Sequence, residues 1–145
     1  MYRNILIATD GSELAGKALE QGLRLARFAE GKATVLTVCE PFRVLSLAPA
    51  QLEESARTYR EEVRKQAEAI LSAAAGRAQQ IGVECETLSV EHDEPHAAII
   101  DTAHRKGCDL IVMASHGRRG LSALVLGSQT VKVLTHSDIP VLVLR

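Results

Sequence analysis

Length, composition and charge restrict this chain to a few classes of protein. It has 145 residues, 46% of them hydrophobic, and 17 basic side chains against 18 acidic ones give a formal net charge of −1. These values predict a single domain over residues 1–145 with one hydrophobic core, and they exclude a disordered or collagen-like chain. A near-neutral balance without a long basic run also argues against partners such as nucleic acid or a membrane surface.

The chain carries the marks of a cytoplasmic protein. No stretch approaches the roughly 18 unbroken apolar residues of a membrane helix, and the first four residues lead directly into a strand pattern. Cys39, Cys85 and Cys108 are odd in number, far apart and without C-x-x-C spacing. We therefore expect buried thiols in a reducing compartment, and neither a disulfide framework nor a zinc site.

In chain order, the first half alternates apolar runs with helical patterns. Residues 4–9 form a continuous apolar run, typical of a strand that is covered on both faces. Ser12 is a good N-cap for a helix whose small apolar residues recur every three or four positions and which ends near Gly31. Residues 33–39 read as a second strand, which Glu40-Pro41 closes.

The middle of the chain predicts an apolar loop and one long helix. Residues 42–49 are apolar without a periodic pattern, so this loop needs a cover. An amphipathic helix then runs to Ile81 with Leu52, Tyr59, Val63 and further apolar residues on one stripe. At about 1.5 Å per residue it is longer than a small sheet, so its first turns overhang the sheet or break. The charged residues between positions 53 and 62 are interpreted as its solvated face.

The last part completes the alternation. Residues 83–90 alternate polar with apolar side chains as an edge strand does, and Pro95 begins a helix that ends by Gly107. Residues 109–113 form a buried strand, residues 131–136 a helix, and residues 139–145 a strand that is apolar on both faces. The order β-α-β-α-β-α-β-α-β predicts an α/β fold with a doubly wound, Rossmann-like, parallel five-stranded sheet in the order 3-2-1-4-5 and helices on both faces.

A basic, glycine-rich loop follows the fourth predicted strand. Residues 113–120 read Met-Ala-Ser-His-Gly-Arg-Arg-Gly, and the loop ends with Gly127-Ser128 at the head of a helix. Glycine lets the backbone approach a ligand closely, and a helix N-terminus favours an anion such as phosphate. In a doubly wound sheet this loop and Asp10, after the first strand, should face each other across one crevice. A plain strand-to-helix connection, in which the glycines only serve turns, stays open as the alternative.

Several of these segments together resemble the universal stress protein family over essentially the whole chain. They are Ala-Thr-Asp-Gly-Ser at 8–12, Met-Ala-Ser-His-Gly at 113–117, the nine residues to Gly127-Ser128, and the ending at 136–143. Nucleotide-binding members of that family carry Gly, two residues, Gly, nine residues, Gly, then Ser or Thr. Here Ala114 stands in place of the first glycine. The resemblance implies a homodimer that binds ATP or another adenine nucleotide.

The resemblance also implies roles for individual residues. Asp10 is expected near the ribose and phosphates, the backbone of Val38 beside the adenine, and the glycine loop around the phosphates. A carboxylate that close to a triphosphate either accepts from ribose hydroxyls or shares a Mg²⁺ ion. The complete predicted cofactor-binding set is Thr9, Asp10, Val38, Met113, Ala114, Gly117, Arg118, Gly127, Ser128, Gln129 and Thr130.

Cationic side chains and hydroxyls leave alternatives open. Arg118, Arg119 and Lys132 are candidates to neutralise phosphate charge, although arginines in a loop are often only solubilising. Ser128 has a competing role as an N-cap.

The histidines and the missing motifs argue against catalysis. His92 and His96 have i, i+4 spacing, but Pro95 intervenes, so we interpret them as an exposed polar turn and predict no metal site. His116 lies inside the loop without a positioned nucleophile, and no catalytic residue is predicted. Walker A, Rossmann G-x-G-x-x-G and G-x-S-x-G patterns are absent from the sequence, which counts against a vigorous ATPase, a dehydrogenase and a hydrolase.

The leading hypothesis is a cytoplasmic stress-response protein that binds an adenine nucleotide as a regulatory ligand and hydrolyses it slowly at most. It would form a homodimer through Pro140 to Leu144, because an edge strand that is apolar on both faces needs cover. One alternative is a nucleotide-free homodimeric interaction protein whose apolar loop at 44–48 docks a partner. Another is a nucleotide hydrolase that uses Mg²⁺ bound at Asp10.

Overall fold

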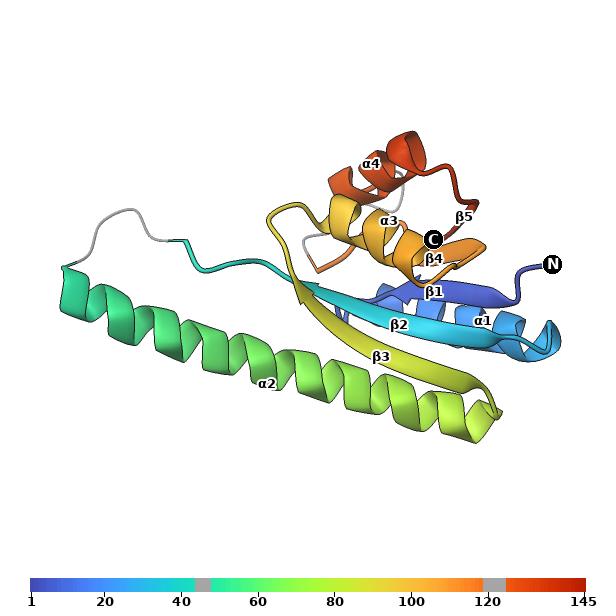
Figure 1. The fold of residues 1–145 in the computed structure, drawn as a ribbon, viewed down its shortest axis with the longest axis horizontal. Coiled ribbons are helices and arrows are strands. Elements are labelled where there is room, and N and C mark those ends of the chain that lie inside the picture. The colour runs from blue at the N-terminus through green and yellow to red at the C-terminus, as the bar shows by residue number, and fades with distance from the viewer. Residues whose placement is uncertain (44–47, 119–124) are drawn as a thin grey trace.

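A parallel sheet with β1 at its centre organises the fold (Figure 1). The structure is a computed structural model that describes residues 1–43, 48–118 and 125–145. The sheet is five-stranded, with the order β3-β2-β1-β4-β5 and parallel pairing throughout. Its strands are β1 (Asn4–Ala8), β2 (Lys32–Cys39), β3 (Glu84–Glu91), β4 (Leu110–Ala114) and β5 (Val141–Leu144). The predicted fold class and strand order are confirmed.

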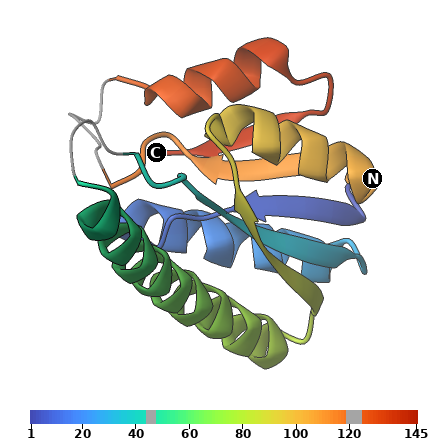
Figure 2. The same cartoon turned by 60° about the vertical axis from the view of Figure 1, so that its left-hand side comes forward.

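Helices cover both faces of the sheet (Figure 2). They are α1 (Glu13–Phe28), α2 (Pro49–Ile81), α3 (Pro95–Arg105) and α4 (Ser128–His136). From β1 the chain winds outward to β2 and β3, with α1 and α2 on one face. It then returns to β4 and β5, with α3 and α4 on the other face. Right-handed crossovers require this change of face when the direction of winding reverses.

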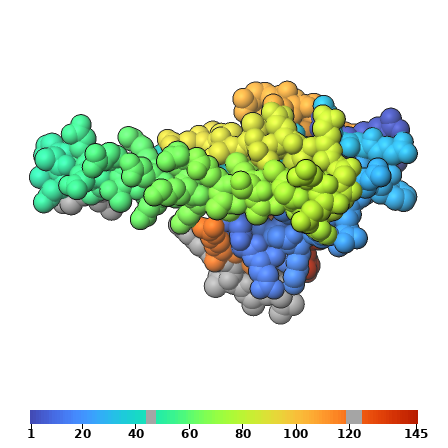
Figure 3. All heavy atoms as spheres, turned by 90° about the horizontal axis from the view of Figure 1, so that it is seen from below, coloured from blue at the N-terminus to red at the C-terminus, as the bar shows by residue number. Residues whose placement is uncertain are grey.

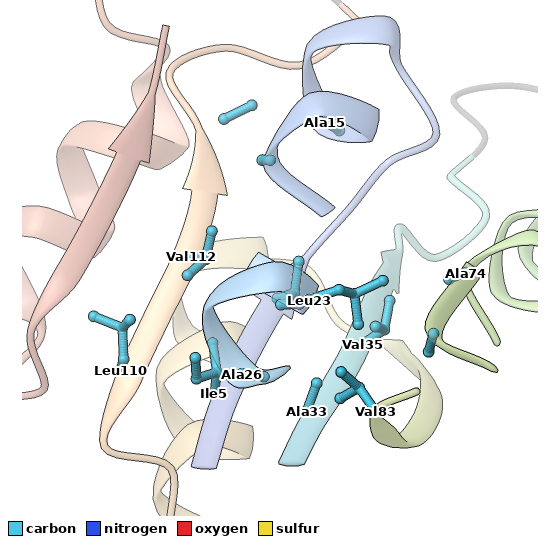
Figure 4. Close-up of a cluster of buried hydrophobic side chains, with 14 residues drawn as sticks. Ile5, Ala15, Leu23, Ala26, Ala33, Val35, Ala74, Val83, Leu110 and Val112 are labelled. Atoms are coloured by element: carbon cyan, nitrogen blue, oxygen red, sulfur yellow. The ribbon is translucent and has the colours of Figure 1, made fainter. Parts of the chain in front are cut away.

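The alternating side chains of β1 supply both layers of the core. Ile5 (Figure 4) and Ile7 pack in the cluster with α1 and α2, and Leu6 packs in the cluster with α3 and α4; all three are fully buried. A Cβ added to Gly22 would lie 2.7 Å from the Ile7 Cδ1 atom. The small-residue face predicted for the first helix therefore serves a close approach of α1 to the central strand.

The long helix α2 projects beyond the sheet (Figures 1 and 3). It runs unbroken for 33 residues from Pro49 to Ile81, so its first turns overhang rather than break. Its last turns pack on the sheet through Ala74 and Ala78, which are buried. Gly82 ends it with φ of 80°, a conformation that glycine adopts without steric cost.

Element boundaries differ from the predicted ones by a few residues. Helix α1 ends at Phe28 with Ala29 as its C-cap, not at Gly31, and the last strand begins only at Val141. Strand β3 lies at a sheet edge, as its alternating pattern predicted. In the part of the chain that the structure describes, no helix is long and apolar enough to cross a membrane.

An ion-pair cluster fastens α2 to α1. Both carboxylate oxygens of Glu20 accept 2.6 Å hydrogen bonds from Arg77, and Arg24 donates a further one of 2.6 Å. The hydrogen bonds from Arg77, and then those from Arg24, lower the pKa of Glu20 from 4.5 to about 2. The cluster is partly exposed, with 28% of the Glu20 side chain and 39% of the Arg77 side chain accessible, so solvent and salt weaken it.

The depressed pKa of Glu20 gives this cluster a defined pH dependence. The ionised Glu20 contributes fully to the free energy of unfolding above pH 4.5, and this contribution is lost as the pH falls toward 2. The reason is that Glu20 takes up its proton at a higher pH in the unfolded chain than in the folded protein. We expect the free energy of unfolding, measured in urea, to fall more steeply over this range in the wild type than in Glu20→Gln. Glu13→Gln is the control, since Glu13 is 91% exposed and lies 3.8 Å from Lys17. Equal slopes for wild type and Glu20→Gln would contradict the assignment.

Candidate functional site

A cavity of about 670 Å³ opens at the carboxyl ends of β1, β2 and β4. Strands β1 and β4 are neighbours from which the chain winds in opposite directions, so the loops that follow them diverge and leave a crevice. The volume falls in the range of small-molecule sites, about 300–1,000 Å³. Every residue of the predicted cofactor-binding set lines this cavity: Thr9, Asp10, Val38, Met113, Ala114, Gly117, Arg118, Gly127, Ser128, Gln129 and Thr130.

The Asp10 carboxylate joins the two loops. Its Oδ1 accepts a 2.9 Å hydrogen bond from the Ser12 N–H, and its Oδ2 accepts a 2.8 Å bond from the Arg118 N–H. The loop after β1 therefore faces the loop after β4, as the sequence predicted. Each carboxylate oxygen keeps capacity for a further donor, such as a ligand hydroxyl.

The environment of Asp10 keeps it ionised at neutral pH. Burial raises its pKa, but hydrogen bonds from Ser12 and Arg118, together with the charge of Arg118, outweigh that effect. The pKa of Asp10 therefore lies below its ordinary value of 3.8. An ionised carboxylate in a half-buried crevice acts as an acceptor for hydroxyl groups and for cations.

Close backbone approach at Gly117 and Gly127 shapes the loop. A Cβ on Gly117 would collide with the Asp10 carboxylate. The Gly127 N–H donates a 2.7 Å hydrogen bond to the Ser115 carbonyl, and a Cβ there would lie 3.3 Å from the His116 Cα atom. Gly117 lets the start of the loop approach Asp10, and Gly127 lets the end of the loop pack against Ser115 and His116 at its start. Glycine permits such close backbone approaches because it has no Cβ.

The first turn of α4 lines the cavity, and its N–H groups receive no hydrogen bond from an N-cap side chain. Gly127 is the N-cap and provides no side-chain cap. The N-cap role considered for Ser128 is therefore wrong, because Ser128 is the first helical residue, and it is exposed. Uncapped N–H groups at a helix start carry partial positive charge and suit an anion.

Thr130 is used structurally. Its hydroxyl contacts the carbonyls of Ala114 and Ser115, both at 3.1 Å, and the residue is 2% exposed. This side chain holds the first turn of α4 against the end of β4. Thr130 therefore reaches the cavity with little polar capacity left for a ligand.

Alanine at position 114 causes no backbone strain. Ala114 ends β4 in strand conformation, and the described non-glycine residues with positive φ are Tyr2 and Glu30. The position therefore does not demand a glycine for its φ angle. Its methyl group contributes to the cavity wall.

The other candidate cations and histidines are placed less centrally. Lys132 does not belong to the cavity lining that the structure describes, and Arg119 lies outside the described residues. His92 accepts a 2.8 Å hydrogen bond from the Glu94 N–H, as a residue of a polar turn does. His116 lies 3.2 Å from the Ser115 hydroxyl, but Ser115 is only 3% exposed and cannot act as an accessible nucleophile.

His96 connects α3 with α4. The backbone N–H of His96 donates a 3.0 Å hydrogen bond to the Gln129 side-chain oxygen. The centre of the His96 ring lies 5.5 Å from that of the His136 ring. Helix α3 has no side-chain cap from its own N-cap residue, so Gln129 supplies that acceptor from α4.

One wall of the cavity was not predicted as part of the site. Helix α2 contributes Tyr59, Val63, Gln66, Ala67 and Ile70. The sequence pattern assigned most of them to the apolar stripe of a helix that packs on a sheet. Large side chains early in that stripe, before the alanines of its second half, are the one signal that this part of the helix stands off from the strands.

Comparison with known proteins gives consistent matches along the whole chain. Residues 1–145 match the model described as the Universal stress protein family. Universal stress protein YxiE of Bacillus subtilis is 34% identical over 149 residues, which cover 100% of each chain. Universal stress protein MJ0577 of Methanocaldococcus jannaschii is 28% identical over 158 residues, covering 100% of this chain and 96% of its own.

Solved structures show the same similarity. A structure of MJ0577 superposes with a TM-score of 0.82 at 27% identity and covers 99% of this chain and 96% of that one. A universal stress protein in complex with cAMP superposes with a TM-score of 0.74 at 25% identity, covering 99% of this chain and 97% of that one.

The contact between Gly117 and Asp10 can be tested by substitution. We expect Gly117→Ala to lower the free energy of unfolding by about 1–3 kcal/mol, because the methyl group separates Asp10 from the Arg118 N–H. Gly16→Ala is the control, since a Cβ there meets nothing within 4 Å. In that exposed helical position alanine should stabilise the protein by about 0.5–1 kcal/mol. Urea unfolding measures both, and a Gly117→Ala variant as stable as wild type would disprove the close contact.

Proposed function

The chain belongs to the universal stress protein family, and we propose that it binds ATP or a related adenine nucleotide as a regulatory ligand in the cavity at the ends of β1, β2 and β4. The observation that carries this proposal is the juxtaposition of the ionised Asp10 with the glycine loop and the start of α4. A hydroxyl-accepting carboxylate beside an anion-binding helix start matches a ribose next to phosphate. The relative solved with cAMP supports an adenine nucleotide as the ligand class.

In this proposal the parts of the ligand are distributed along the cavity. The ribose hydroxyls donate to Asp10, and the phosphates lie against Gly117, Gly127 and Ser128, with Arg118 as their counter-charge. The motif is Ala114, two residues, Gly117, nine residues, Gly127 and Ser128. The adenine lies at the end of β2, beside the backbone of Val38.

A magnesium ion is compatible with this arrangement. Mg²⁺ accompanies nucleotide triphosphates through their phosphate oxygens and one or two carboxylates. The lowered pKa of Asp10 keeps that carboxylate available as a ligand.

We further propose a binding module rather than a dedicated enzyme. Asp10 already accepts two backbone N–H groups, and the hydroxyl nearest to His116 is buried, so neither presents an activated water or nucleophile. Slow hydrolysis remains compatible with the site. Steady phosphate release that Asp10→Asn abolishes would favour the hydrolase alternative instead. The loop at 44–48 invoked for the interaction alternative lies, apart from Ala48, outside the described residues.

The proposed assembly is a homodimer through Pro140 to Leu144. Strand β5 forms an edge of the sheet, and Leu142 on it is 40% exposed. On the adjoining helix α4, Val131 and Leu134 are 46% and 43% exposed. A second copy that pairs with the edge and covers these side chains would satisfy both the backbone and the apolar surface. The free thiols of the three cysteines agree with a cytoplasmic location.

Nucleotide binding should be visible as thermal stabilisation. ATP with Mg²⁺ at about 100 times its Kd should add about 2.7 kcal/mol to the stability of the wild type and raise its melting temperature. We expect ATP to leave the melting temperature of the Gly117→Val, Gly127→Val double variant unchanged, because the valine side chains fill the space at the loop. In Asp10→Asn we expect a smaller rise in melting temperature than in the wild type. Circular dichroism establishes that each variant is folded. Absence of any rise with ATP, ADP, AMP or cAMP, in wild-type protein free of bound ligand, would refute the proposal.

The homodimer can be tested at Leu142. We expect Leu142→Glu to shift the protein from dimer to monomer in analytical ultracentrifugation, because a carboxylate cannot be buried unpaired in an interface. Leu52→Glu is the matched control, since Leu52 is 39% exposed in the first turn of α2, and that end of the helix projects away from β5 (Figure 1). A monomeric wild type, or a Leu142→Glu variant that remains dimeric, would contradict this interface.

A further inference from the structure

We propose that the aromatic ring of Tyr59 is the surface against which the base of the nucleotide packs, and that it makes this end of the cavity selective for a planar aromatic group. The proposal rests on the proposed function, because it assigns a recognition element within the same cavity. Tyr59 carries the one Phe, Tyr or Trp ring among the lining residues that the structure describes.

The Tyr59 ring is held in place from two sides. Its hydroxyl donates a 2.9 Å hydrogen bond to the carbonyl of Glu40. Its ring centre lies 5.3 Å from that of Phe42, at an interplanar angle of 48°. Glu40 and Phe42 both belong to the segment directly after β2. The ring is therefore attached to the strand end that carries Val38, and its position is fixed before any ligand arrives.

The position of the ring along the cavity matches a base. Asp10 follows the central strand β1, the glycine loop follows β4 on one side of it, and Tyr59 is bound to the end of β2 on the other side. Two strand spacings separate the end of β4 from the end of β2, about 10 Å. A nucleotide with its ribose at Asp10 and its phosphates at the glycine loop extends its base toward Tyr59.

Apolar side chains of α2, with Gln66 among them, form the cavity wall beside Tyr59. One helical turn further along α2, Val63 lines the same wall, and Ala67 and Ile70 continue it. The helix N–H groups of α4 lie instead at the β4 end, where Ser128 begins that helix. An apolar wall with an aromatic ring suits stacking, which accepts any base but not a bare sugar phosphate.

The composition of the chain allows a direct optical test. It contains no Trp and only two Tyr residues, Tyr2 and Tyr59. Tyr2 precedes β1 and so lies at the opposite end of the sheet from the cavity. In Tyr2→Phe the fluorescence comes from Tyr59 alone, and in Tyr59→Phe it comes from Tyr2 alone. Free N-acetyltyrosinamide, titrated in parallel, corrects for light that the nucleotide absorbs.

We expect ATP and adenosine to quench the fluorescence of Tyr2→Phe in a saturable manner, and inorganic tripolyphosphate and ribose 5-phosphate to leave it unchanged. The fluorescence of Tyr59→Phe should not respond to ATP. Calorimetric titration of Tyr59→Leu should give an affinity for ATP about tenfold weaker than wild type, which corresponds to about 1.4 kcal/mol. Phe42→Leu, which removes an aromatic ring outside the lining set, should lose less affinity than Tyr59→Leu.

The outcomes separate this inference from the function on which it rests. If ATP stabilises the wild type but leaves Tyr59 fluorescence unchanged, and Tyr59→Leu keeps wild-type affinity, the base-packing role is wrong and the nucleotide site stands. If Tyr59→Leu lowers only the melting temperature of the ligand-free protein, the ring merely docks α2, and the inference is again overturned. If the wild type binds no adenine nucleotide at all, the proposed function fails and this inference fails with it.

Discussion

The position of the cavity depends on the reversal of winding between β1 and β4. The hydrogen bond from the Arg118 N–H to Asp10 crosses the sheet at that reversal. Right-handed crossovers send the chain outward from β1 on one face of the sheet and from β4 on the other, so the loops after these neighbouring strands separate. One carboxylate bridges them, and it accepts a backbone N–H on each side of the gap. The cavity is thus a consequence of topology, and Asp10 determines how closely its two sides approach.

Helix α2 serves two purposes along its length. In its last turns Ala74 and Ala78 are small enough for the helix to pack directly on the sheet. In the turns before them, larger side chains such as Tyr59 and Val63 hold the helix away from the strand ends, and the space left between them becomes a wall of the cavity. The same amphipathic stripe therefore makes core in its last turns and a wall of the cavity in the turns before them. The helix itself is unbroken along its length (Figure 1), so we attribute this division to side-chain size.

The described polar groups of the site are the basis on which we propose a binding module. Asp10 is ionised but engaged, Thr130 is occupied by two carbonyls, and the hydroxyl beside His116 is buried. What remains open is an anion-favouring helix start, a carboxylate with spare lone pairs and an apolar wall. In the proposed function, this combination binds the separate parts of a nucleotide by their own chemistry.

The sequence by itself determined the strand and helix order, the strand order in the sheet and the two loops that face each other across the crevice, because these follow from local patterns and from crossover rules that act on every β-α-β unit. Asp10, Gly117 and Gly127 were recognisable because strand ends and glycine spacing are local features. Element ends were less well defined, since the last residues of a helix depend on capping contacts such as that at Ala29.

Only the tertiary structure showed that Gly127 and not Ser128 is the N-cap of α4, that Ala114 needs no positive φ, and that Gln129 caps α3. It alone placed Tyr59 in the cavity wall, because an apolar stripe has the same periodicity whether it meets a strand or an open space, and only the packing of distant segments decides which.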